Sequence, residues 1–134
     1  MDALLETRAL TYAQAARFIL PAAGAAAENV SAETAFHTAV SKGWLPETAS
    51  AGDIARLDRV ALFLMKAFDL RGGLFYRFFP NARYAYRELA HKRIIQGDAD
   101  SSMPLSGTDF FQILGRTMDV VENPGTETGG DRKK

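Results

Sequence analysis

Oxygen-bearing side chains are spaced between residues 98 and 109 in a pattern that could bind calcium. At positions 1, 3, 5, 9 and 12 of an EF-hand-like loop stand Asp98, Asp100, Ser102, Ser106 and Asp109. Position 6, however, is Met103 where the sharp turn needs glycine, and position 12 is an aspartate, which reaches a metal less well than glutamate. We therefore favour a structural loop, in which the aspartates accept hydrogen bonds from backbone amides, over a calcium site.

A second group of charged residues stands where a helix is expected to begin. Arg56, Asp58 and Arg59 lie within four residues of one another. They can form a solvent-exposed capping and ion-pair cluster, which contributes about 0 to 1 kcal/mol per pair. Alternatively, the guanidinium groups can hold a carboxylate on a ligand, because their planar fork matches its two oxygens. Both interpretations stay open, and the first is favoured.

Aromatic and basic side chains alternate in residues 75–87, "FYRFFPNARYAYR". Such a mixture can stack on sugars or bases, and Arg83 lies within it. The favoured interpretation is core packing by Tyr84 or Tyr86, followed by a sugar or partner surface. Trp44 is likewise expected in the core rather than on a ligand platform.

The sequence contains none of the residue patterns that we associate with catalysis or cofactors. It has no cysteine and only two histidines, and it lacks the HExxH, P-loop and GxGxxG motifs. We expect a protein that is not an enzyme and that needs no cofactor.

Composition limits the class of partner. The chain has 134 residues, 47% of them hydrophobic, which is enough for one domain with a core. Sixteen basic residues balance sixteen acidic ones, so we expect no nucleic-acid partner. The longest apolar run, Val60 to Met65, is far shorter than the roughly 20 residues that cross a bilayer, so no membrane span is expected.

The spacing of apolar residues predicts an all-helical fold. Residues recur at three-to-four spacing in five segments, which are Tyr12 to Leu20, Ala32 to Val40, Leu57 to Phe68, Ala82 to Ala90 and Asp109 to Val120. Pro and Gly residues such as Pro21 separate these segments, and Ser31, Asp53 and Asn81 are expected to cap helices. The polar end of the chain, residues 122–134, is expected to be disordered.

The helices belong to an internal repeat of about fifty residues. "SAETAFHTAVSKGWL" from Ser31 aligns with "NARYAYRELAHKRII" from Asn81. Downstream, "IARLDRVALFL" from Ile54 aligns with "LSGTDFFQILG" from Leu105, one residue further apart, and "LTYAQAARFIL" from Leu10 is a third copy. The domain, residues 1–121, thus divides into a half unit (8–24) and two full units (31–71 and 79–121).

This pattern resembles the S-layer homology (SLH) family. Its repeat has an aromatic-proline opening, a WAY-like helix, a "GIIxG" loop and an "LTRAE" motif. Residues 79 to 120, "FPNARYAYRELAHKRIIQGDADSSMPLSGTDFFQILGRTMDV", are the most similar part. The middle unit matches through Trp44 and "IARLD", and the first half unit through "LTYAQ". The resemblance implies tandem helix-loop-helix repeats packed as a pseudo-threefold helical bundle.

The resemblance also implies a function. The family anchors proteins to cell-envelope polymers through the arginine of LTRAE, whose place falls on Tyr12, Arg56 and Gly107, so only the middle unit keeps it. We expect a non-catalytic, carbohydrate-binding module of the bacterial cell envelope that binds cell-wall polysaccharide or peptidoglycan. Its expected ligand-binding residues are Arg56, Asp58, Arg59, Trp44, Tyr12 and Arg83.

The loss of two of the three arginines keeps an alternative open. In that alternative the chain is a protein-interaction or scaffold domain that has kept an SLH-like fold, and its partner is an envelope protein. Whether the chain forms a homo-oligomer is left open, and its place in the periplasm or at the cell surface rests on the resemblance.

Overall fold

Five α-helices account for most of the described structure, which is a computed structural model covering residues 8–70, 76–77, 80–97 and 100–122. They are α2 (Tyr12–Ala22), α3 (Ala32–Ser41), α4 (Leu57–Ala67), α6 (Ala82–His91) and α7 (Gly107–Glu122). The described part contains no β-strand, so the prediction of an all-helical fold is confirmed. None of its helices combines the length and the apolar character that crossing a bilayer requires.

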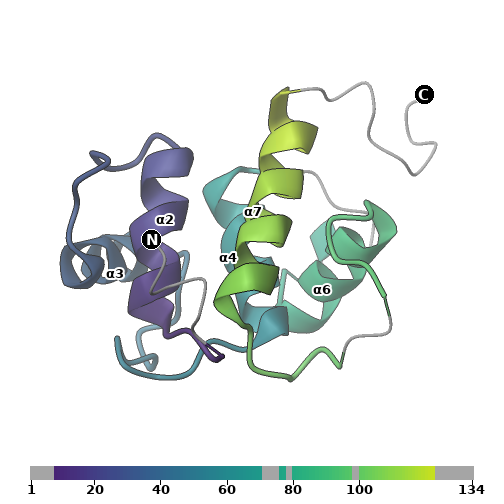
Figure 1. The fold of residues 1–134 in the computed structure, drawn as a ribbon, viewed down its shortest axis with the longest axis horizontal. Helices are drawn as coiled ribbons and strands as arrows, with labels where there is room; N and C mark the ends of the chain where they lie inside the picture. Colours follow the sequence, from purple (N-terminus) through teal and green to yellow (C-terminus); the bar gives the residue numbers. More distant parts are fainter. Residues whose placement is uncertain (1–7, 71–75, 78–79, 98–99, 123–134) are drawn as a thin grey trace.

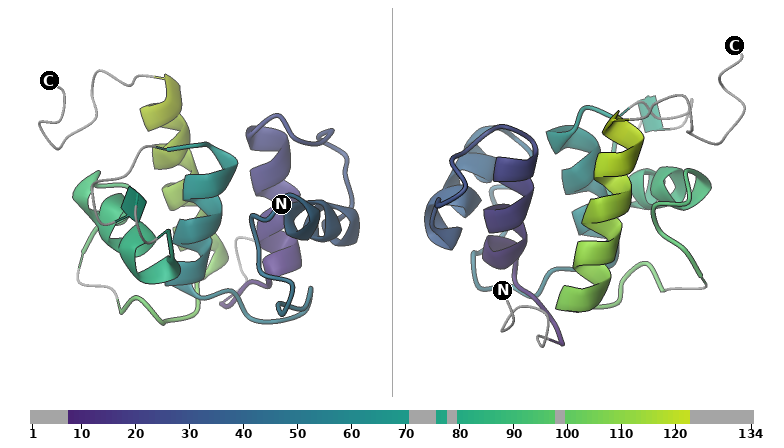
Figure 2. Two further views of the ribbon diagram at one scale, coloured as in Figure 1. Left: turned by 180° about the vertical axis from the view of Figure 1, so that it is seen from behind. Right: turned by 45° about the horizontal axis from the view of Figure 1, so that its top comes forward.

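Helices α2, α4 and α7 begin at the same end of the molecule and run in a similar direction (Figure 1). Helix α3 packs on the outer side of α2, and α6 packs on the outer side of α4 (Figures 1 and 2). Helix α2 also contacts both α4 and α7. The architecture is therefore a set of three helices with a further helix against two of them.

The core lies between these helices. Its largest fully buried side chains include Ile19, Phe63 and Phe110, one from each of α2, α4 and α7. Phe18 of α2 and Phe111 of α7 meet edge to face, with ring centroids 5.1 Å apart, a geometry that adds to the free energy of burial. Packing between residues distant in sequence thus joins α2 to α7.

Most helix boundaries follow local signals. The side chains of Ser31 and Asn81 cap α3 and α6, as predicted. The prediction for Asp53 was wrong, because its carboxylate accepts a hydrogen bond from the backbone of Ser50 within the loop, and Arg56 is the N-cap residue of α4. Pro21 does not stop α2 immediately either, since it stands inside the last turn and the helix ends one residue later, at Ala22.

Three backbone hydrogen bonds form a closed ring at the start of α2, α4 and α7. Leu10 donates to Leu105 over 2.9 Å, Ala55 donates to Leu10 over 2.9 Å, and Leu105 donates to Ala55 over 3.2 Å. All three residues are fully buried, so each bond satisfies polar groups that water cannot reach. The ring therefore fixes how the N-terminal ends of the three helices lie relative to one another.

The same local hydrogen bonds recur fifty residues apart. Trp44 donates to Ala39 as Ile94 donates to Leu89, in both cases over 2.9 Å. Gly43 and Arg93, which precede Trp44 and Ile94, both have left-handed backbone, with φ of 79° and 66°. The ends of α3 and α6 are consequently built in the same way.

The ring differs from the sequence alignment in one detail. It places Ala55, rather than Ile54, in the position of Leu10 and Leu105. Ala55 and Leu105 are fifty residues apart, whereas the alignment paired Ile54 with Leu105, which are one residue further apart. Arg56 follows Ala55 as Thr11 follows Leu10 and Ser106 follows Leu105. On this basis Leu57, and not Arg56, corresponds to Tyr12 and Gly107.

Three predicted boundaries and most of the predicted tail fall on residues that the structure does not describe. Residues 1, 71, 79 and 123–134 lie outside the described residues, whereas Glu122, the first residue of the predicted tail, is the last residue of α7.

Candidate functional site

The charged cluster at the start of α4 contains an ion pair. Arg56 Nη2 lies 2.8 Å from Asp58 Oδ2, and the side chains of Arg56 and Asp58 are 46% and 10% exposed. Asp58 Oδ1 is buried and has no hydrogen-bond partner among the described residues. The pair is thus not a fully solvent-exposed cluster, because its carboxylate is packed into the protein.

Tyr12 lies beside this pair. The backbone N–H of Arg56 donates to the Tyr12 hydroxyl over 3.4 Å. Burial raises the pKa of Tyr12 above its usual value of 10, against the opposing effects of the Arg56 hydrogen bond and the Arg59 charge. Tyr12, Arg56 and Arg59 line a shallow hollow together with the loop residues Thr48, Ala49, Asp53 and Ile54.

A larger pocket lies on the other side of Arg59. It has a volume of about 460 Å³ and lies between the end of α3, the outer face of α4 and the start of α6. Trp44, Arg59 and Arg83 line it, as does Lys66, whose Nζ donates to the carbonyl oxygen of Gly43 over 3.2 Å. Five of the six predicted ligand-binding residues therefore line two neighbouring surfaces, which share Arg59. The sixth, Asp58, lines neither of these described surfaces.

We call the larger of these surfaces the Trp44 pocket. Its described lining carries three cations, Arg59, Lys66 and Arg83, and no acidic residue. Within the described part of the chain, the guanidinium groups of Arg59 and Arg83 form no ion pair and no hydrogen bond. Three positive charges with no acidic residue in the described lining attract a negatively charged ligand, and the indole ring offers an apolar surface on which a ring-shaped group can pack.

Trp44 is partly buried and packs against the hydrophobic core, and Lys42 Nζ lies 5.4 Å from the centre of its ring. One side of the indole therefore supports the fold while another faces the pocket. The prediction of a core tryptophan describes only part of its environment.

Lys66 is the residue that sequence reasoning missed. It follows Arg59 by seven positions on α4, with Leu62 between them, so the three lie on one face of the helix. This spacing could have indicated Lys66, but the sequence does not show that α6 and the end of α3 form the other walls.

The segment with calcium-like spacing has internal hydrogen bonds. Asp100 Oδ1 accepts from the Ser102 backbone N–H over 3.0 Å and from its hydroxyl over 2.9 Å. These bonds, the backbone one first, lower the pKa of Asp100. Asp98 lies outside the described residues, and in the described part no three Asp, Glu or His side chains come together as metal ligands would.

The aromatic and basic residues near α6 that can be described have different surroundings. Arg87 lies over the ring of Tyr84, 5.7 Å from its centre, whereas Arg83 lines the Trp44 pocket. Ala85 and Leu89 are the fully buried residues of α6, and Tyr86 packs partly against the core. Phe75, Phe78 and Phe79 lie outside the described residues.

Comparison with known proteins identifies no relative. No family model matches the sequence, and no curated protein or solved structure is similar to the chain. The case for a function therefore rests on the geometry of these surfaces and on the resemblance of the sequence motifs.

Proposed function

We propose that this chain is a non-catalytic module of the bacterial cell envelope that binds an anionic cell-wall glycan in the Trp44 pocket. The main support for this proposal is the presence of three cations around Trp44 and the absence of any acidic residue from the described lining. The chain as a whole is neutral, so this charge is local and would select a ligand at this place.

The chemistry of the pocket fits an acidic sugar. Arg59 and Arg83 can each hold a carboxylate through two parallel hydrogen bonds, and the indole of Trp44 offers an apolar face to a sugar ring. A volume of about 460 Å³ is within the range of small-ligand sites. The neighbouring hollow at Tyr12 and Arg56 would contact the next sugar of a polymer.

The SLH-like, pseudo-threefold arrangement of repeats is part of this proposal. The closed ring of Leu10, Ala55 and Leu105 and the hydrogen bonds that recur fifty residues apart support it. The cell-envelope location follows from the same resemblance.

The role that the resemblance gives to Arg56 is less well supported than that of Arg59. Arg56 is paired with Asp58, and the ring places it one position away from Tyr12 and Gly107. Arg59 has no such partner in the described structure, and it faces both surfaces. We therefore assign the main anion contact to Arg59 and Arg83.

Sedimentation with purified bacterial sacculi tests the proposal. Wild-type protein should sediment with sacculi that retain their acidic wall polymers and remain in solution with sacculi stripped of them. Because a charge-assisted hydrogen bond contributes about 1.5 to 3 kcal/mol, Arg59→Gln and Arg83→Gln should each weaken binding about tenfold or more. Arg56→Ala should have a smaller effect.

Arg87→Gln is the matched control, because Arg87 is exposed on the same helix as Arg83 and does not line the pocket. If wild-type protein stays in the supernatant with intact sacculi, glycan binding is wrong. If the Arg59 and Arg83 variants sediment as the control does, binding takes place elsewhere on the molecule.

A further inference from the structure

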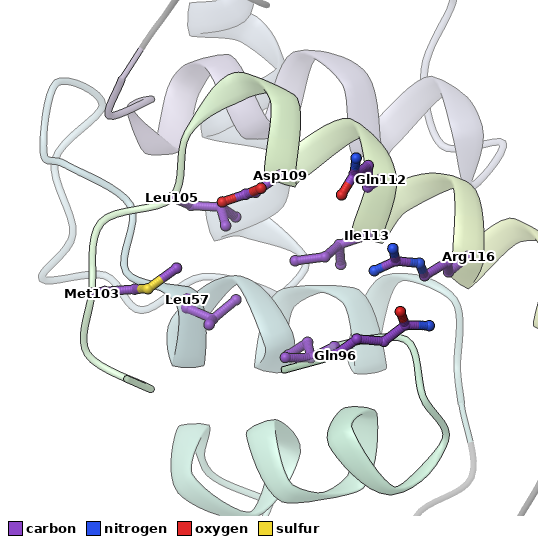
Figure 3. A pocket seen from close by; sticks show the side chains of 9 residues that line it. Leu57, Gln96, Met103, Leu105, Asp109, Gln112, Ile113 and Arg116 are labelled. Atoms are coloured by element: carbon purple, nitrogen blue, oxygen red, sulfur yellow. The ribbon is translucent and has the colours of Figure 1, made fainter. Parts of the chain in front are cut away.

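A smaller pocket lies beneath α7, away from the predicted ligand-binding residues (Figure 3). It has a volume of about 160 Å³. Leu57 of α4, Leu105 and Ile113 form its apolar floor, and all three are almost completely buried. The floor is therefore a fixed part of the core rather than a group of loose surface side chains.

The size of this pocket limits what can enter it. A cavity of about 150 Å³ lined by aliphatic side chains holds a benzene ring, so this pocket has room for one leucine-sized group. It is open to solvent, because exposed side chains stand at its rim. The group that enters can thus remain attached to a longer molecule outside.

Polar groups surround the opening. The amide side chains of Gln96 and Gln112 stand on opposite sides of the pocket in Figure 3. Each primary amide donates and accepts hydrogen bonds, as a peptide backbone does. The rim can therefore pair with the main chain on either side of an inserted side chain.

Opposite charges mark the two ends of the opening. Asp109 stands at the end nearest Leu105, and Arg116 stands at the other end (Figure 3). Arg116 Nη1 donates to the carbonyl oxygen of Ile94 over 3.2 Å, which holds the guanidinium in place. Neither residue forms an ion pair in the part of the chain that is described.

The spacing of the two charges can be compared with that of an extended peptide. Asp109 and Arg116 are seven residues apart on α7, which corresponds to about 10 Å along the helix axis. In an extended chain every second side chain points to the same face, and four residues span about 13 Å. Flexible basic and acidic side chains two positions before and after an inserted residue would therefore reach Asp109 and Arg116.

We propose that the α7 pocket is a docking site for an extended peptide in which an aliphatic residue has a basic residue two positions to one side and an acidic residue two positions to the other, for example basic-x-aliphatic-x-acidic. The aliphatic side chain enters the pocket, the basic one pairs with Asp109, and the acidic one pairs with Arg116. This site is distinct from the Trp44 pocket, whose described charges are all positive. A protein partner can thus bind independently of a glycan.

The peptide acetyl-Lys-Ala-Leu-Ala-Glu-amide tests this proposal when it is titrated into the full, isotope-labelled chain and followed by amide chemical shifts. Shifts should move at Gln96, Gln112, Ile113 and Arg116 and stay constant at Trp44. Replacing the leucine of the peptide by alanine should abolish the effect, and replacing its lysine by glutamate should weaken binding about two- to fivefold, as expected for an exposed pair.

Asp109→Asn should remove the preference for lysine over glutamate in the peptide, while Asp119→Asn should keep it. Asp119 is the matched control, because it is exposed on the same helix and does not line the pocket. The proposal is overturned if the leucine and alanine peptides bind equally, or if no shift moves at the pocket with millimolar peptide. Because the peptide series uses wild-type protein, it decides the matter even if the Asp109 variant folds poorly.

Movement of the same pocket resonances by an acidic sugar such as glucuronate, with no response to the peptide, would assign the pocket to the glycan and would also overturn the proposal.

Discussion

Arg93 has a left-handed backbone conformation that is unfavourable for a residue with a Cβ, whereas Gly43, at the end of α3, adopts the same conformation without this cost. Both residues follow the end of a helix with left-handed backbone, at φ of 66° and 79°. For a residue with a Cβ this conformation costs about 1 to 2 kcal/mol. A glycine at this position avoids that cost, but its greater backbone freedom stabilises the unfolded chain by about 0.4 to 1 kcal/mol. Arg93→Gly should therefore stabilise the protein by about 0.5 to 1 kcal/mol.

Gly43→Ala should have the opposite effect and about the same magnitude. A Cβ placed on Gly43 meets no atom within 4 Å, so the cost comes from the backbone alone and not from a clash. The two sites share no contact that the structure shows, so the double variant should be close to wild type in stability. Urea unfolding followed by circular dichroism at 222 nm measures all three differences.

Arg93→Ala separates the backbone effect from the loss of the side chain. It removes the guanidinium but keeps the Cβ, so its free energy of unfolding should stay within about 0.5 kcal/mol of wild type. If Arg93→Ala stabilises as much as Arg93→Gly, the gain comes from the charge and the reasoning is wrong. It is equally wrong if Arg93→Gly destabilises the protein.

Three further results are expected. Thr11→Ala should cost about 1 kcal/mol in urea unfolding, because it removes the capping box that Thr11 and Gln14 form at α2, whereas Thr48→Ala in an exposed loop should be nearly neutral. The free energy of unfolding should fall as the pH rises above about 10, because burial raises the pKa of Tyr12 in the folded state and the unfolded chain loses its proton first. Tyr12→Phe should reduce this fall without abolishing it, since the pKa of Tyr76 is raised as well, and an unchanged slope would contradict the assignment. Millimolar calcium should leave the melting temperature unchanged, and a rise that a chelator reverses would restore the calcium interpretation of residues 98–109.

Local signals in the sequence predicted the helices well. The three-to-four periodicity placed the starts of α2, α3, α4 and α6 at the residues where they begin, and the Ser31 and Asn81 caps were identified correctly. These features depend on residues that are close in the chain. A helix start capped by its own neighbours can therefore be recognised without knowledge of the fold.

Features that depend on residues distant in the chain were harder to predict from the sequence. The alignment matched Asp58 with Asp109 because both are acidic, and this shifted the extended segment by one residue. The hydrogen bonds in the structure instead connect Ala55 with Leu10 and Leu105, and these three residues come from separate parts of the chain. The Trp44 pocket likewise needs walls from α3, α4 and α6, so the part played by Lys66 became clear only in the structure.

The ring of three backbone hydrogen bonds has a consequence for how the chain folds. Its members are about 45 and 50 residues apart, so the ring can close only after long stretches of chain have been brought together. Contacts of this separation slow folding and make it cooperative. A chain that ended before residue 105 would leave the Leu10 N–H and the Ala55 carbonyl without their partners. During synthesis, α2 and α4 should therefore gain their full stability only when the last ring segment has left the ribosome.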